Sequence, residues 1–318
     1  MRCVRWVAIV GLLALATWPV VGSAQKASLV IGMVAGISTD AFYVTMHHGA
    51  EAAAKVLGVD LVWEGAPEWS YAKQTPIVNA MVARHVGALI VSPTDKTAMV
   101  PPIKAAAQAG IPVFETDTVA NDGVHLSLVT SDNLDGGRKA ADILAKLLGE
   151  RGEVALINTI PGVSTTDDRQ TGFLEEIKKY PNLKVVATQY DQDDKSKATS
   201  IVSSWLLAHP ALGGVFAANE LSGDGASVAI ADAHKTGTVK LVEYDAEPAQ
   251  VRDLKRGVVQ ALIVQRPFAE GFLGVEFAYN YLEGWGAGSF PKAVTLPAVV
   301  ATKDNMDNPD VSRWFYSF

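Results

Sequence analysis

The sequence predicts an α/β fold with two doubly wound parallel sheets. A first strand–helix–strand unit occupies residues 28–65. The same alternation of short apolar runs and helical stretches continues to residue 148, and it starts again at residue 153. Such alternation is typical of parallel sheets covered by helices on both faces. Two rounds of it in 318 residues, of which 49% are apolar, predict two domains of similar plan.

The first unit carries a loop suited to ligand binding. Residues 28–35 are apolar and β-branched, as in a strand covered on both faces. Asp40 is a good N-cap for the helix that follows, and Gly58 ends that helix. In open α/β sheets the loop after the first strand lies at the carboxyl edge, where ligands bind. The adjacent aromatics Phe42 and Tyr43 either grip a small polar molecule there or pack under the loop.

The later elements of both rounds follow the same alternation. In the first round we expect strands at 58–63, 87–91, 111–115 and 125–129, with helices at 71–84 and 96–109 and a helix ending at 148. In the second round we expect strands at 153–157, 183–187, 213–217, 239–244 and 258–264, with helices at 169–180, 195–208 and 267–282. Residues 162–168 are expected to form a loop.

Polar residues follow several of these strands. They are Asp117, Arg169, Asn219, Asp245 and Gln265. If the carboxyl edges of the two sheets face each other, these side chains line a cleft between them. The Asp and Asn side chains are equally well explained as helix caps.

The amino terminus has the pattern of a secretory signal peptide. Arg2 and Arg5 precede an apolar run at 7–21 that is shorter than the about 20 residues of a membrane span, and small residues follow at 22–24. We expect cleavage near Ala24 and a soluble, periplasmic protein. The single cysteine, Cys3, leaves with this segment, which predicts neither disulfide nor thiol chemistry in the mature chain.

Composition and motifs argue against several classes of function. Without Arg2 and Arg5 the chain carries 25 basic and 34 acidic residues, a net charge of −9 that disfavours nucleic acid as a partner. His47 and His48 are adjacent on a helix and have no surrounding ligand set, so no metal is expected. The acidic run at 191–194 lacks the Gly and Glu of a calcium loop. No dinucleotide-binding turn or nucleophile elbow is present, and we expect no catalytic residues and no cofactor.

Residues 29–300 resemble the ribose-type periplasmic sugar-binding proteins, which are substrate-binding subunits of ABC importers. The resemblance rests on a series of motifs in a fixed order. These motifs lie at 31–43, 88–95, 109–113, 131–133, 136–137, 169–173, 208–212, 215–219 and 244–245. A sugar-responsive repressor shares this fold but would carry a DNA-binding helix pair where this chain has a signal peptide.

The resemblance implies a type I periplasmic binding protein with a three-segment hinge. The amino-terminal domain would comprise residues 27–130 and 266–296, and the carboxyl-terminal domain residues 131–265 and 297–318. The chain would cross between the domains near Thr130, Gln265 and Pro297.

The resemblance also implies the residues of the site. Phe42 and Tyr43 would stack on the C–H faces of a sugar ring, and a ring of polar side chains would read its hydroxyl groups. The seven implied ligand-binding residues are Phe42, Tyr43, Asp117, Arg169, Asn219, Asp245 and Gln265.

The sequence departs from the family's usual pattern at four places, five residues in all, so the particular sugar stays open. Thr118 stands where an Arg is common, Asp193 where an aromatic often covers the sugar, Asp40-Ala41 where Asn-Pro is frequent, and Glu243 where Gly is usual. Trp69 or Tyr71 could supply the missing aromatic or simply pack over its own domain.

The expected function is therefore high-affinity capture of a monosaccharide or polyol by a monomer, with delivery to an ABC transporter permease. The alternative is a binder of a furanosyl quorum signal or of a chemoreceptor ligand on the same scaffold.

Overall fold

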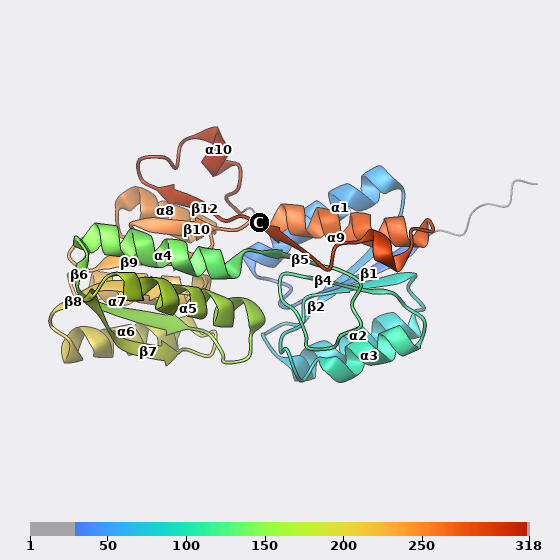
Figure 1. Cartoon of the computed structure of the whole chain (residues 1–318), viewed down its shortest axis with the longest axis horizontal. Helices are drawn as coiled ribbons and strands as arrows, with labels where there is room; N and C mark the ends of the chain where they lie inside the picture. Colours follow the sequence, from blue (N-terminus) through green and yellow to red (C-terminus); the bar gives the residue numbers. More distant parts are fainter. Residues whose placement is uncertain (1–28, 317–318) are drawn as a thin grey trace, which may run out of the picture.

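The computed structural model describes residues 29–316 and contains two six-stranded sheets that lie side by side (Figure 1). The segment predicted as a signal peptide lies outside the described residues. Helices flank each sheet, and the chain passes from one sheet to the other more than once. The predicted fold class of two doubly wound sheets is confirmed.

The first sheet is parallel throughout, in the order β11-β5-β4-β3-β1-β2. Its strands are β1 (Val30–Ala35), β2 (Asp60–Gly65), β3 (Ala88–Val91), β4 (Val113–Thr116), β5 (Leu128–Ser131) and β11 (Ala293–Leu296). Helices α1 (Ala41–Leu57) and α9 (Pro267–Leu282) share a core with Ile31 and Met33 on one face. Helices α2 (Tyr71–Ala83) and α3 (Val100–Gln108) share a core with Val34 and Leu89 on the other.

The second sheet has the order β12-β10-β9-β8-β6-β7, and only its edge strand β12 is antiparallel. Its strands are β6 (Arg151–Asn158), β7 (Asn182–Tyr190), β8 (Leu212–Ala217), β9 (Lys240–Tyr244), β10 (Ala261–Val264) and β12 (Val299–Thr302). Its helices are α4 (Asn133–Leu148), α5 (Ser164–Glu176), α6 (Lys195–Ala208), α7 (Glu220–Asp232), α8 (Pro248–Arg256) and α10 (Pro309–Ser312). Two short 3₁₀ helices, η1 (Ile177–Lys179) after α5 and η2 (Ala287–Ser289) before β11, are the remaining elements of the described residues.

Along residues 29–316 the chain crosses between the two sheets three times. It leaves the first sheet after β5, returns through α9 after β10, and leaves again between β11 and β12. Helix α9 lies tightly against α1, because Gly49 and Gly271 let the backbones meet: a Cβ at Gly49 would lie 1.9 Å from the carbonyl oxygen of Phe268. Among residues 29–316, no helix is long and apolar enough to cross a membrane.

Two helices begin elsewhere than the sequence predicts. Residues 96–99 precede α3 as turns rather than α-helix, because Pro101 and Pro102 have no N–H to bond to the carbonyls of Thr97 and Ala98. Helix α5 begins at Ser164, inside the predicted loop. Ser164 Oγ accepts from the amide of Val119 beside the first sheet, a tertiary contact that no local pattern reveals.

Candidate functional site

A cavity with about 490 Å³ of space between its lining atoms, including its opening to solvent, lies between the two sheets. Its lining contains all seven residues that the sequence predicts for the site. They are Phe42, Tyr43, Asp117, Arg169, Asn219, Asp245 and Gln265. We call this space the central cavity.

The aromatic wall comes from the first turn of α1. Asp40 caps this helix, as predicted, with its Oδ1 accepting from the amides of Phe42 at 2.7 Å and Tyr43 at 3.4 Å. The two aromatic rings meet edge to face at 5.1 Å, and the Tyr43 hydroxyl donates to Asp117 Oδ2 at 2.5 Å. The rings therefore line the cavity in a fixed orientation.

Asp117 lies at the carboxyl end of β4 with a left-handed backbone, φ 60°. Its amide donates to the Val129 carbonyl, and its own carbonyl accepts from Thr130 Oγ1. Asp117 does not cap a helix. Burial is the main cause that raises the pKa of its carboxyl to about 6.

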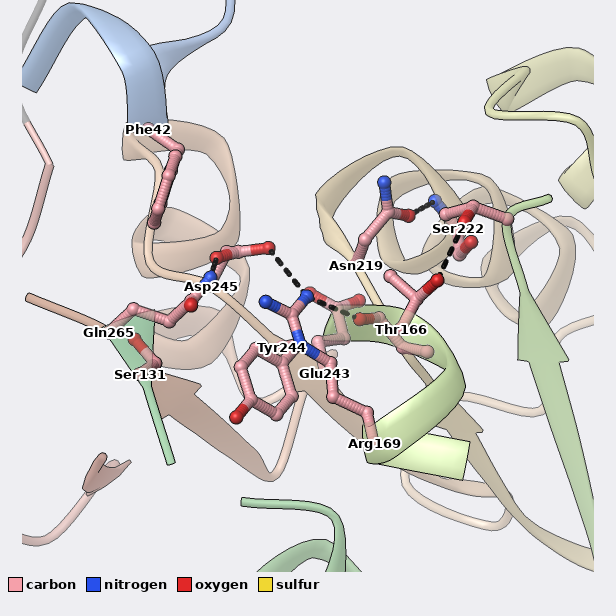
Figure 2. A network of polar contacts seen from close by, with 12 residues as sticks. Phe42, Ser131, Thr166, Arg169, Asn219, Ser222, Glu243, Tyr244, Asp245 and Gln265 are labelled. Carbon is pink, nitrogen blue, oxygen red and sulfur yellow. Dashed lines mark hydrogen bonds and ion pairs between the residues drawn. The ribbon is translucent and has the colours of Figure 1, made fainter. Parts of the chain in front are cut away.

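Arg169 is held from several sides at the second sheet. Its Nε donates to Asn133 Oδ1 and its Nη1 to the Ala218 carbonyl, both at 2.8 Å. The guanidinium lies 3.7 Å from the centre of the Tyr244 ring and 4.0 Å from Asp245 Oδ2 (Figure 2). Since only 3% of Arg169 is exposed, the side chain is oriented before any ligand arrives.

The glycine pair predicted as a family motif makes room for this arrangement. A Cβ at Gly136 would lie 1.9 Å from the Tyr244 hydroxyl oxygen, and one at Gly137 would lie 2.1 Å from the Arg169 carbonyl oxygen. Helices α4 and α5 can therefore approach closely enough to place the Arg169 guanidinium over the Tyr244 ring.

Asp245 follows β9 with a left-handed backbone, φ 81°. Its Oδ1 accepts from Gln265 Nε2 at 2.5 Å and from the Tyr316 hydroxyl at 2.9 Å. The interpretation of Asp245 as a helix cap is wrong, because Glu247 occupies the N-cap of α8. Gln265 is 2% exposed, and its Oε1 has no hydrogen-bond partner within the described chain.

Asn219 has the capping role that the sequence allowed. Its Oδ1 accepts from the amide of Ser222 at 3.0 Å at the start of α7. Its Nδ2 donates to Asp193 Oδ1 at 2.8 Å. Asn219 thus caps a helix and also faces the cavity.

Sequence reasoning did not assign several other lining residues to the site. They are Asp40, Trp69, Thr159, Val163, Thr165, Thr166, Asp193 and Glu220. Trp69, one of two candidates for an additional aromatic, lies against Tyr43 with ring centres 6.3 Å apart, while the exposed Tyr71 is not in the lining. The sequence drew attention to Asp40 as a cap and to Asp193 as a departure. Glu220 gave no signal, since acids are common in first turns.

Three carboxyl groups of the cavity, those of Asp40, Asp193 and Glu220, have raised pKa values. Burial, followed by repulsion from Asp245 and Asp193, raises the pKa of Asp40 to about 8. Burial and repulsion from Asp40 and Asp245 raise the pKa of Glu220 well above its usual range. The pKa of Asp193 is also raised, chiefly by burial. In the ligand-free protein these groups therefore tend to keep their protons, and each protonated carboxyl both donates and accepts hydrogen bonds near the one guanidinium.

Comparison with known proteins places this geometry in a family. The family described as "Periplasmic binding protein domain" matches residues 31–285. The ribose import binding protein RbsB of Bacillus subtilis (strain 168) is 31% identical over 88% of this chain and 90% of its own length. RbsB of Escherichia coli (strain K12) is 33% identical over 80% of this chain and 85% of its own length.

Solved structures agree with this placement. An ABC transporter solute binding protein from Agrobacterium vitis, bound with α-D-tagatopyranose, is 39% identical with a TM-score of 0.89, covering 92% of this chain and all of its own. A carbohydrate transporter solute binding protein from Agrobacterium radiobacter, in complex with D-arabinose, is 31% identical with a TM-score of 0.86 over the same shares. The expectation of a binding protein rather than an enzyme is confirmed by the family. From the matched family and from these relatives, we conclude that this chain belongs to the periplasmic binding protein family.

Proposed function

We propose that this protein captures a monosaccharide or polyol in the central cavity and delivers it to an ABC importer. The observation that carries the proposal is the pairing of two walls. One sheet contributes Phe42, Tyr43 and Asp117, and the other contributes Arg169 and Asp245. An aromatic wall opposite a charged polar wall suits a molecule with apolar C–H faces and a fixed pattern of hydroxyl groups. Relatives named or solved with ribose, tagatose and arabinose support this ligand class.

Each predicted site residue receives a role in this proposal. Phe42 and Tyr43 contact the C–H face of the sugar ring, while the free carboxylate oxygens of Asp117 and Asp245 accept from hydroxyls. Arg169 donates to hydroxyl or ring oxygens, and Asn219 and Gln265 complete the polar ring. A hydrogen bond to a charged group contributes about 1.5–3 kcal/mol once water is excluded.

We further propose that the ligand closes two domains around itself. The limits proposed are residues 27–130 with 266–296, and residues 131–265 with 297–318. Contacts between the two sheets' loops support a closed arrangement: Lys96 Nζ lies 2.7 Å from Asp167 Oδ2, and the Lys96 amide donates to the Gly162 carbonyl. A ligand that touches both walls gains contacts on closure and shifts the population toward the closed form.

The proposal places the mature protein in the periplasm as a monomer. The signal peptide would be cleaved near Ala24, and the closed form would dock on an ABC transporter permease. A chemoreceptor is a second partner of the same closed form in this proposal.

A thermal-shift screen followed by calorimetric titration tests the proposed function. The panel contains D-ribose, D-allose, D-apiose, D-arabinose, D-tagatose, D-fucose and simple polyols. A ligand that binds only the folded state stabilises that state by about 2.7 kcal/mol when its free concentration is 100 times its Kd. At least one compound of the panel should therefore raise the Tm. The same compound should bind Asp245→Ala more weakly in the titration. Failure of every monosaccharide and polyol, aminated derivatives included, to bind would contradict the proposal.

A further inference from the structure

We propose that the captured ligand carries a protonated amine, as in an aminated monosaccharide or polyol, and that its ammonium group lies among Asp40, Asp193 and Glu220. We call these three residues the acidic end of the cavity. The inference rests on the proposed function, since it concerns the same cavity, and it specifies the chemical class of the ligand.

The charge of the lining is strongly one-sided. Five carboxyl groups line the central cavity, and Arg169 is the single basic residue in that lining. The five acids are Asp40, Asp117, Asp193, Glu220 and Asp245. Like charges gathered in a water-poor site repel strongly unless a cation or protons neutralise them. The described lining therefore lacks cations for most of its acids.

Arg169 is engaged by groups other than the acidic end. Its guanidinium lies over Tyr244, near Asp245, and bonds to Asn133 and the Ala218 carbonyl. The acidic end instead borders a second hollow that opens beside Trp69. Lys195, two residues after Asp193, is engaged with Asp224. Within residues 29–316 no ion pair involves the acidic end, which leaves room for a cation brought by the ligand.

The hydrogen-bonding capacity of the acidic end is also one-sided. One oxygen of Asp40 is bound by the amides of α1, and one oxygen of Asp193 by Asn219. The Glu220 carboxyl, 9% exposed, has no hydrogen bond within the described chain. A sugar hydroxyl brings two acceptor lone pairs with each donor, whereas an ammonium brings three donors and no acceptor. A ligand ammonium would take the place of the protons on these acids, supplying both the positive charge and the donors that the ionised carboxylates need.

Two further observations point to a donor-rich ligand. Gln265 Oε1 is a buried acceptor in the cavity lining without a partner among the described residues, so it requires a donor from the ligand. The Trp69 ring lines both the cavity and the hollow beside the acidic end. An aromatic face next to carboxylates is a favourable surrounding for an ammonium group.

Matched calorimetric titrations of the purified mature protein test the inference. Each set joins an amine, its hydroxyl parent and its N-acetyl derivative: D-galactosamine, D-glucosamine and D-mannosamine with their hexoses, and 1-amino-1-deoxy-D-sorbitol with D-sorbitol. The neutral sugars of the thermal-shift panel are titrated alongside. At least one amine should bind about tenfold or more tightly than its parent and its N-acetyl derivative, the worth of one charge-assisted hydrogen bond.

Two variants place the ammonium in the cavity. Glu220→Gln and Asp193→Asn should each weaken the amine about tenfold and weaken its neutral parent less. Asp232→Asn, exposed on the same helix as Glu220, removes an equal charge outside the cavity and should change neither. Circular dichroism and Tm confirm folding of each variant.

The outcomes separate the two claims. If neutral compounds bind and no amine exceeds its parent, the inference is overturned and the proposed function stands. If an amine binds better but neither variant weakens it selectively, the assignment to the acidic end is overturned. If no compound in either panel binds, the proposed function itself fails.

Discussion

Replacing Asp245 by alanine removes the carboxylate on which the second wall of the cavity converges. In the parent, Asp245 Oδ1 accepts from Gln265 Nε2 and the Tyr316 hydroxyl, and Oδ2 lies 4.0 Å from Arg169 Nη1. The substitution deletes the ligand's acceptor and leaves Gln265 and Tyr316 without their partner. It also takes a counter-charge from a buried guanidinium.

The expected losses differ between stability and affinity. Arg169 keeps its bonds to Asn133 and the Ala218 carbonyl, so we expect unfolding to become easier by about 1–3 kcal/mol, the cost of unsatisfied buried groups. If the ligand donates two hydrogen bonds to the carboxylate, affinity falls by about 3–6 kcal/mol, or about 10²–10⁴ in Kd. The larger effect should appear in binding.

Calorimetric titration with the best compound of the screen measures the affinity, and urea unfolding measures the stability. Tyr316→Phe is the matched control, because it removes one bond to Asp245 and keeps the carboxylate; it should cost about 1 kcal/mol in stability and less than about tenfold in Kd. Asp245→Asn serves as a second variant if the alanine protein does not fold. A folded Asp245→Ala protein that binds within about threefold of the parent would refute the assignment.

Three further predictions concern closure, pH and packing. Lys96→Met removes a partly exposed ion pair between the loops of the two sheets. The Kd of the ligand should rise about two- to fivefold and should depend less on salt concentration. An unchanged Kd with an unchanged salt dependence would exclude a role of this ion pair in closure. The pKa values of Asp117 and Asp40 are raised to about 6 and about 8, so the folded protein holds these protons more tightly than the unfolded chain. The contribution of these two groups to the stability of the ligand-free protein should therefore be fully present below about pH 4 and be lost as the pH rises, by about pH 6 for Asp117 and by about pH 8 for Asp40, at up to about 1.4 kcal/mol per pH unit and group. Between pH 6 and 8 the urea stability should fall less steeply in Asp40→Asn than in the parent, and a rise in the parent over this range would contradict the prediction. Gly137→Ala places a Cβ 2.1 Å from the Arg169 carbonyl oxygen, so it should destabilise the protein by about 1–3 kcal/mol and weaken ligand binding. The control Gly288→Ala has open space around its Cβ and should change stability and binding by less than about 0.5 kcal/mol. Equal effects of the two substitutions would show that the α4–α5 contact is not critical.

Local signals in the sequence are sufficient for most of the fold. Asp40 as an N-cap and Gly58 as a C-cap set the limits of α1 as predicted, because capping acts within one turn. The helix expected at 267–282 has the same bounds in the structure. Apolar runs likewise mark the buried strands, since both faces of each sheet are covered by helices.

The features missed by the sequence depend on contacts between distant segments. Helix α5 begins at Ser164, whose Oγ accepts a hydrogen bond from the amide of Val119, 45 residues away. The Tyr316 hydroxyl donates to Asp245, 71 residues away in the sequence, and no local sequence pattern at either residue predicts this contact. Trp69 and Glu220 join the lining only because their loops converge at the edges of the two sheets. The types of residue suggested candidates for the site, but which of them lie together depends on how the whole chain folds.

A crystal structure of the protein with the tightest compound of the panels tests the central claim most directly. The account predicts one ligand molecule in the central cavity, with a ring or chain face against Phe42 and with polar atoms within hydrogen-bond distance of Asp117, Arg169 and Asp245. A ligand bound at another surface, or one in the cavity that contacts residues of only one sheet, would contradict it.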